Sequence, residues 1–206
     1  MRVPEAESYP RRGGPMMQAF GRFVLAITGW RIEGALPELP KFIIIGAPHS
    51  SNWDFIFGMS AAFALRLRVT ILAKHTLFRG PLAPIMRWCG VIPVNRSASH
   101  GVVGECVQAL VGADKMIVAI TPEGTRTPGP TWKSGFWRIA RAANVPVVPI
   151  ALDFGCRAVR IGAPMMMTDD VDADAARLSD FYVGVRGARR TIERPIAMRD
   201  PIRMAD

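Results

Sequence analysis

Residues 41–54 read KFIIIGAPHSSNWD and place a histidine and an aspartate directly after an apolar run. The run over 41–47 is short and rich in β-branched residues, which predicts a buried strand. A helix is expected to begin near residue 53, so the chain turns between the strand and the helix. A buried strand that leads directly into a helix is the repeating unit of α/β proteins.

The same alternation continues toward the C-terminus. Strands are predicted over 69–73, 91–95, 115–121, 145–153 and 157–164, and helices over 55–67, 76–88, 100–112 and 135–143. This order predicts an α/β fold, a single domain with a largely parallel sheet flanked by helices. Pro146 and Pro149 place the strand over 145–153 near a sheet edge or let it bend, because proline donates no hydrogen bond. The acidic cluster at 169–174 indicates a capped helix start rather than a cation site, with the helix around 174–190.

The first forty residues are expected to lie outside the main domain, which we place at 41–206. Residues 1–14 predict a flexible arm, and residues 15–30 predict an amphipathic helix. One side of this helix carries its apolar residues, namely Met16, Phe20, Phe23, Val24, Ile27 and Trp30. Two interpretations fit this side equally: insertion into a membrane interface beside neighbouring arginines, or packing on the domain's own core.

Composition limits the classes of function. Half of the 206 residues are hydrophobic, which is enough for a sizeable core and excludes an intrinsically disordered chain. The net charge of +9 suits an acidic partner such as nucleic acid, an anionic membrane or a phosphorylated substrate. Three dispersed cysteines without a Cys-x-x-Cys pair indicate a reducing compartment. No apolar stretch reaches 18 residues and the first fifteen are polar, so we expect neither a transmembrane helix nor a secretory signal.

His49 and Asp54 form the first candidate pair. Histidine titrates near neutral pH and can act as a general base, while a carboxylate on its other ring nitrogen fixes the tautomer. Residues five apart on one helix are rotated by about 140°, so the two side chains meet only across a turn. A structural role fits equally well, with Ser51 as helix N-cap and Asp54 stabilising the first turn. The carboxyl end of a strand, where His49 falls, is nevertheless where α/β sheets bind ligands.

Three other strand ends carry charged residues. The turn TPEGTRT at 121–127 contains Glu123, and Gly124 permits a close backbone approach to a ligand. Arg126 in this turn and Arg96 at the end of GVIPVNR suit a phosphate or a developing oxyanion. Lys74 follows the strand VTILA. Each cation alone is more often a surface residue, but a base with several cations at one rim suits acyl transfer to a phosphate-bearing alcohol.

Four of these segments together resemble the glycerolipid acyltransferase superfamily, of the lysophosphatidate acyltransferase type. His49-SSNW-Asp54 is similar to its His-x4-Asp motif. GVIPVNR (90–96), Glu123-Gly-Thr-Arg126 and VPVVPIAL (145–152) resemble its second, third and fourth blocks. The blocks occur in the family's order and cover about half of the chain, 49–152, so we identify 41–206 as an acyltransferase domain.

The resemblance implies transfer of a fatty acyl group from acyl-CoA or acyl-carrier protein to the free hydroxyl of 1-acylglycerol 3-phosphate, which gives phosphatidic acid. His49 would be the general base and Asp54 its partner. The substrate-binding residues implied are Lys74, Arg96, Glu123, Gly124, Thr125 and Arg126, with the cations on the acceptor's phosphate and Glu123 positioning the acceptor. No bound cofactor and no metal are expected, since His75 and His100 show no ligand spacing with His49.

The resemblance further implies a membrane-associated enzyme that meets its lysophospholipid and acyl donor at the cytoplasmic face. Pro48 and Thr121 depart from the residues that many members carry, so another lysophospholipid or a lyso-aminolipid remains an alternative acceptor. Nucleic acid is not an expected partner, because the basic residues are spread along the chain without a recognition motif. A catalytically silent membrane adaptor is the remaining alternative.

Overall fold

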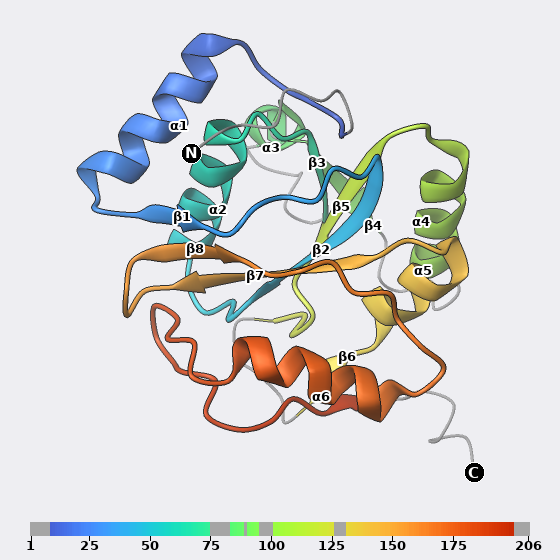
Figure 1. The fold of residues 1–206 in the computed structure, drawn as a ribbon. Coiled ribbons are helices and arrows are strands. Elements are labelled where there is room, and N and C mark those ends of the chain that lie inside the picture. Colours follow the sequence, from blue (N-terminus) through green and yellow to red (C-terminus); the bar gives the residue numbers. More distant parts are fainter. Residues whose placement is uncertain (1–8, 75–82, 89, 95–100, 126–130, 200–206) are drawn as a thin grey trace.

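The computed structural model describes residues 9–74, 83–88, 90–94, 101–125 and 131–199. One seven-stranded sheet has the order β1-β8-β7-β2-β5-β3-β4 (Figure 1). Its strands are β1 (Arg31–Glu33), β2 (Lys41–Ala47), β3 (Val69–Lys74), β4 (Val91–Val94), β5 (Met116–Ile120), β7 (Val147–Asp153) and β8 (Ala158–Ile161). The helices are α1 (Pro15–Ile27), α2 (Trp53–Ala64), α3 (Ala83–Trp88), α4 (Gly101–Gly112), α5 (Gly135–Ala143) and α6 (Val171–Tyr182). A small second sheet pairs β6 (Trp132–Lys133) with β9 (Met198–Arg199).

The expected α/β fold is confirmed: a single domain with a largely parallel sheet flanked by helices. Strands β7, β2, β5, β3 and β4 pair in parallel, and only the β7–β8 pairing within this sheet is antiparallel among the described residues. β2 is central and most of its residues are buried, as its continuous apolar sequence requires. The carboxyl ends of β2, β3, β4 and β5 consequently meet along one edge of the sheet.

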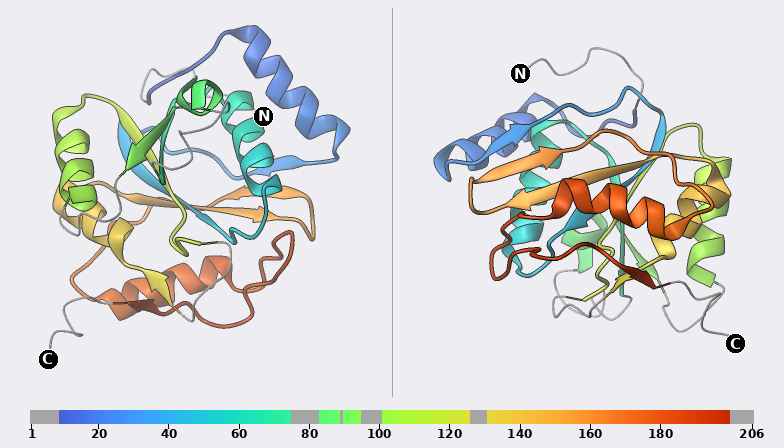
Figure 2. Two further views of the ribbon diagram at one scale, coloured as in Figure 1. Left: turned by 180° about the vertical axis from the view of Figure 1, so that it is seen from behind. Right: turned by 60° about the horizontal axis from the view of Figure 1, so that its bottom comes forward.

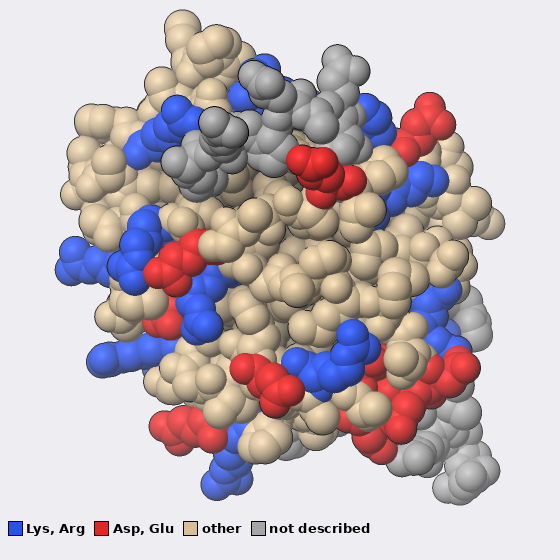
Figure 3. Space-filling view, viewed as in Figure 1, with Lys and Arg blue, Asp and Glu red and all other residues tan. Residues whose placement is uncertain are grey.

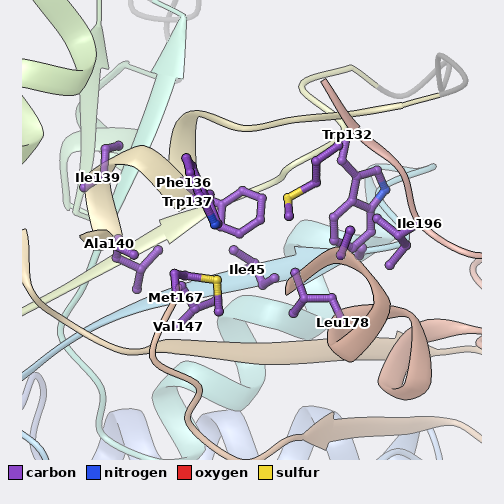
Figure 4. Close-up of a cluster of buried hydrophobic side chains, with 14 of the residues drawn as sticks. Ile45, Trp132, Phe136, Trp137, Ile139, Ala140, Val147, Met167, Leu178 and Ile196 are labelled. Carbon is purple, nitrogen blue, oxygen red and sulfur yellow. The ribbon is translucent and has the colours of Figure 1, made fainter. Parts of the chain in front are cut away.

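Helices cover both faces of the sheet (Figure 2), and alternate residues of β2 belong to the core clusters on its two sides. Ile43 and Ile45 pack in a cluster that includes residues of α4, α5 and α6, among them Leu178 (Figure 4). Phe42 and Ile44 pack on the other side, against residues of α2 and the loop that follows it. Because successive side chains of a strand point to opposite faces, one apolar run supplies both cores. The loop at residues 48–52 therefore begins at the end of a strand that is packed on both faces.

β7 lies inside the sheet, between β8 and β2. Of the two expectations for its prolines, the position near an edge is therefore wrong, and the bend stays a prediction. Pro149 pairs with Ile45 of β2 and lacks an N–H. The Tyr182 hydroxyl lies between the two strands, where it accepts the N–H of Ile150 at 3.1 Å and donates to the carbonyl of Ile45 at 2.7 Å. A side chain from α6 therefore supplies hydrogen bonds where the prolines interrupt the ladder.

The N-terminal segment packs more closely on the domain than the sequence indicated. Tyr9 is buried and Arg11 forms a β-bridge with Leu67, so the expected flexible arm is ordered over its described part, residues 9–14. The remaining residues, 1–8, lie outside the described part. β1 joins the main sheet beside β8, so the chain does not divide at residue 40. This region is therefore built into the domain.

The apolar side predicted for the first helix does not pack as a whole on the core, and its insertion into a membrane interface stays a prediction. Gly21 of α1 lies so close to α2 that a Cβ there would come within 2.5 Å of the Ser60 carbonyl, and Leu25 is buried. Trp30 also belongs to the core, stacked on Phe57 of α2 with ring centroids 4.1 Å apart. The other side of α1 exposes four large apolar side chains, those of Met16, Phe20, Phe23 and Ile27. One side of α1 thus packs on the domain and the other has no described neighbour to cover it.

The C-terminal helix begins earlier and ends earlier than expected. The Asp170 side chain accepts the N–H groups of Asp172 and Ala173, which confirms that the acidic cluster caps the helix. α6 ends at Tyr182, not near 190, and Gly184 adopts a positive φ of 87°. The chain is thereby free to fold back, and residues 184–192 run toward the loop that follows β2.

Candidate active site

The loop after β2 returns on itself so that Asp54 lies beside His49. Asp54 is in the first turn of α2, and its Oδ2 accepts the backbone N–H groups of Ser50 at 2.6 Å and Ser51 at 2.7 Å. The same oxygen lies 3.3 Å from His49 Nδ1. The N-cap of α2 is Asn52 rather than Ser51, whose hydroxyl accepts the Trp53 N–H at 3.3 Å. One carboxylate therefore both ties the loop to the helix and faces the imidazole.

The two side chains of this pair differ in exposure. The Asp54 side chain is 2% exposed, whereas that of His49 is 23% exposed. A carboxylate on Nδ1 stabilises the tautomer that carries its proton there, which leaves Nε2 as the proton acceptor. The arrangement therefore presents a reachable base that is oriented by a buried carboxylate, as proton abstraction from a substrate hydroxyl requires.

Glu123, in the turn that follows the neighbouring strand β5, fixes the backbone of His49. Its Oε2 accepts the His49 N–H at 2.9 Å and forms an ion pair with Arg190. Glu123 is buried, and this burial raises the pKa of its carboxyl group, while the His49 N–H and the Arg190 guanidinium act to lower it. Gly124 follows with a φ of 69°, a conformation that favours glycine and tightens the turn. Glu123 thus joins two strand-end loops into one unit.

The segment after α6 closes the site from a third direction. Arg190 reaches Glu123, and the neighbouring Arg189 N–H donates to the Ser50 hydroxyl at 3.2 Å. The sequence does not predict this contribution, because its pattern indicates a helix up to residue 190. No motif marks the segment, and a basic composition was its only signal.

A model of the family described as Acyltransferase matches residues 31–153, which is more than half of the chain. The chain belongs to the Acyltransferase family. The resemblance carried by the four sequence blocks is thereby confirmed, and 31–153 includes every residue of the candidate site except those of the 184–192 segment.

The fold of this acyltransferase is similar to that of a solved structure, the 1-acyl-sn-glycerophosphate (LPA) acyltransferase PlsC from Thermotoga maritima. The two share 18% sequence identity with a TM-score of 0.57, over 81% of this chain and 75% of that chain. Comparison with curated proteins finds no match. At this identity the likeness shows a common fold.

The structure brings together those predicted site residues of the acyltransferase that it describes in full. His49 contacts both Asp54 and Glu123, and Gly124 and Thr125 complete the turn after β5. Lys74 is the last residue of β3, which lies beside β5 in the sheet. The Lys74 side chain, Arg96 and Arg126 lie outside the described residues, as do His75 and His100.

A metal-ligand cluster and a membrane-spanning helix are both absent from the described residues. Within them, no group of three or more His, Cys, Asp and Glu side chains is arranged to hold a metal ion. None of the helices they form has the length and apolar character that a membrane span requires.

Proposed function

We propose that this acyltransferase moves a fatty acyl group from acyl-CoA or acyl-carrier protein to the free hydroxyl of 1-acylglycerol 3-phosphate. The product is phosphatidic acid, a step of phospholipid biosynthesis. The observation that carries the proposal is the 3.3 Å approach of His49 Nδ1 to Asp54 Oδ2 at the carboxyl end of the central strand. The family match and the fold shared with PlsC support the same chemistry.

In this mechanism His49 Nε2 takes the proton of the acceptor hydroxyl as its oxygen attacks the thioester carbonyl carbon. A carbon–oxygen bond forms, the carbon–sulfur bond breaks, and the imidazolium returns the proton to the departing thiolate. Asp54 Oδ2 stabilises the imidazolium that forms between these steps. Transfer is direct, without an acyl-enzyme, and no bound cofactor or metal takes part. In this proposal the cations Lys74, Arg96 and Arg126 bind the acceptor's phosphate, Gly124 and Thr125 contribute to substrate binding, and Glu123 positions the acceptor.

Product analysis tests the acceptor. We expect mass spectrometry to find phosphatidic acid when the purified protein receives lysophosphatidate and an acyl donor, offered as acyl-CoA and as acyl-carrier protein in parallel. Lysophosphatidylcholine and lyso-ornithine lipid serve as competing acceptors. Preferential acylation of either one would show that this lipid, and not lysophosphatidate, is the acceptor. Absence of any acylated lipid would refute the assignment of the protein as an enzyme.

Peripheral association with a membrane at the cytoplasmic face is part of this proposal. The outer side of α1 exposes Met16 by 87%, Ile27 by 65%, Phe23 by 60% and Phe20 by 57%. Figure 3 shows a mostly uncharged surface over α1, and beside β1 and β8 it shows Lys and Arg side chains together with acidic ones. Aromatic and aliphatic side chains flanked by cations suit the interface of an anionic bilayer.

The position of α1 links this surface to the site. Trp30, just beyond the end of α1, stacks on Phe57 in the first half of α2, and Trp53 lies 6.0 Å from the same ring. Trp53, Phe55 and Ile56 are exposed at the start of α2, next to the catalytic loop. Exposed apolar side chains therefore lie both on α1 and at the start of α2 beside the catalytic loop, and in this proposal they guide a lipid chain that leaves the bilayer.

Replacement of Phe20 and Phe23 by serine is expected to weaken binding to vesicles that contain anionic lipid. Loss of two inserted aromatic side chains, at about 1.5 kcal/mol each or more, predicts a decrease in affinity of at least tenfold. Vesicle sedimentation measures the effect, with Val111→Ser as control because Val111 is 60% exposed on α4, on the other side of the sheet. Equal binding of the double variant and the wild type would contradict a membrane role for α1.

A further inference from the structure

We propose that Arg190 is a positioning residue of the active site, which holds the His49 loop in place through its ion pair with Glu123. The inference rests on the proposed acyl transfer and extends it to a segment outside the residues matched by the family model, 31–153. Arg190 touches no reacting atom in this scheme, and it acts through Glu123 on the base.

The contacts form a continuous chain. The Arg190 guanidinium pairs with Glu123 Oε2, and the same oxygen accepts the His49 backbone N–H at 2.9 Å. The Glu123 side chain is 1% exposed and that of Arg190 is 23% exposed, so water competes little for the carboxylate. Glu123 Oε1 is also buried and has no hydrogen-bond partner in the described part of the chain. Arg190 is thus the cation that compensates a carboxylate withdrawn from water.

The backbone that carries Arg190 is itself fixed to the catalytic loop. Residues 184–192 fold into a hairpin-like turn, with Gly184 N–H on the Ile192 carbonyl at 2.8 Å and Ile192 N–H on the Val185 carbonyl at 3.0 Å. At its tip, the Arg189 N–H reaches the Ser50 hydroxyl, and a Cβ on Gly187 would come within 3.0 Å of the Pro48 ring. The turn therefore contacts residues on both sides of His49, and it is held there independently of the ion pair.

The charges around Glu123 set the expected pH dependence. Arg190 and His49 both lower the pKa of Glu123, whereas burial raises it; Tyr182 also lies close enough to be influenced by this carboxylate, and Lys133 packs against the adjacent Gly124. Loss of the Arg190 charge removes a lowering influence, so the pKa of Glu123 moves further up. A charged acceptor makes the stronger hydrogen bond, so Glu123 holds the His49 N–H most strongly when it is ionised. With the raised pKa, this ionised form exists only at higher pH.

Three variants of the full-length protein test this role: Arg190→Gln, Arg190→Lys and, as control, Arg194→Gln. Arg194 is exposed four residues farther along, so its variant carries the same change of charge away from the site. We expect Arg190→Gln to lower kcat by about tenfold or more at neutral pH and to shift the acid limb of its pH profile upward. We expect Arg190→Lys to keep most of kcat and to leave the acid limb at the pH of the wild type. Arg194→Gln is expected to match the wild type in kcat and in the position of the acid limb.

Hydrogen exchange followed by mass spectrometry adds a readout that does not depend on activity. Peptides covering residues 48–54 are expected to exchange faster in Arg190→Gln than in the wild type or in Arg194→Gln. In a Glu123→Gln background the further change at Arg190 is expected to have little effect on either readout, because the partner charge is already absent.

The outcomes separate this inference from the proposed function. A wild type that acylates no lysolipid refutes the function, while the exchange measurement still reports whether Arg190 holds the loop. An active wild type with Arg190→Gln indistinguishable from Arg194→Gln overturns the positioning role. A lowered kcat with an unshifted pH profile and unchanged exchange over residues 48–54 also overturns it, since neither readout then connects Arg190 with the His49 loop.

Discussion

Replacement of His49 by alanine is expected to lower kcat for acyl transfer by about 10²–10⁴, the usual contribution of a general base. The imidazole faces Asp54 through Nδ1 and is the titratable group of the catalytic loop with a side chain open to solvent. Its loss leaves the acceptor hydroxyl without a proton acceptor, but the sites for the two substrates remain. We therefore expect KM values near those of the wild type, measured by steady-state kinetics with lysophosphatidate and acyl-CoA.

The fold should tolerate this substitution. The contact that His49 makes with Glu123 uses its backbone N–H, which alanine retains. Circular dichroism and thermal unfolding are expected to match the wild type, so a decrease in rate reports on chemistry. Full activity in His49→Ala would show that His49 is not the base. If the protein were a catalytically silent membrane adaptor, the variant would keep the adaptor function. Recovery of radiolabelled acyl group on the wild-type protein would contradict direct transfer.

The core of the site follows from the sequence because it depends on local chain geometry. The apolar run at 41–47 forms a strand with the predicted bounds, and the helix starts at Trp53 as expected. A turn of five residues between them is what allows His49 and Asp54 to meet. The proximity of Glu123 also follows, since β5 pairs in parallel with β2 and both strands end at the same edge.

Features that depend on distant segments do not follow from the sequence. The internal position of β7 is possible because Tyr182, some thirty residues later, supplies hydrogen bonds beside Pro149. Likewise, Arg190 reaches Glu123 only because α6 ends at Tyr182 and the chain folds back. Burial of Tyr9 requires the surface formed by the loop after α2, with Leu67. In each case tertiary packing selects one outcome among several that local preference allows.

The Asp54→Asn substitution is expected to lower kcat by about 10²–10⁴ as well, for a different reason. Asp54 Oδ2 accepts the N–H groups of Ser50 and Ser51 and faces His49 Nδ1, so it meets donors only. An asparagine has one acceptor oxygen and one donor nitrogen. If its oxygen stays on the two loop N–H groups, a neutral acceptor faces the imidazole and no longer stabilises the imidazolium. If its nitrogen turns inward, two donors oppose each other at a buried position.

Stability measured alongside kinetics distinguishes the catalytic role of Asp54 from its structural one. An unsatisfied buried donor costs about 1–3 kcal/mol, so thermal unfolding of Asp54→Asn should shift downward. Asp180→Asn, at an exposed position of α6, is the matched control for the loss of one carboxylate. Because His49 and Asp54 act as one unit, the double variant His49→Ala/Asp54→Asn is expected to be no slower than His49→Ala alone. If Asp54→Asn unfolds at a lower temperature but transfers acyl groups at the wild-type rate below that temperature, the carboxylate only caps the loop, and the base must be oriented by something else.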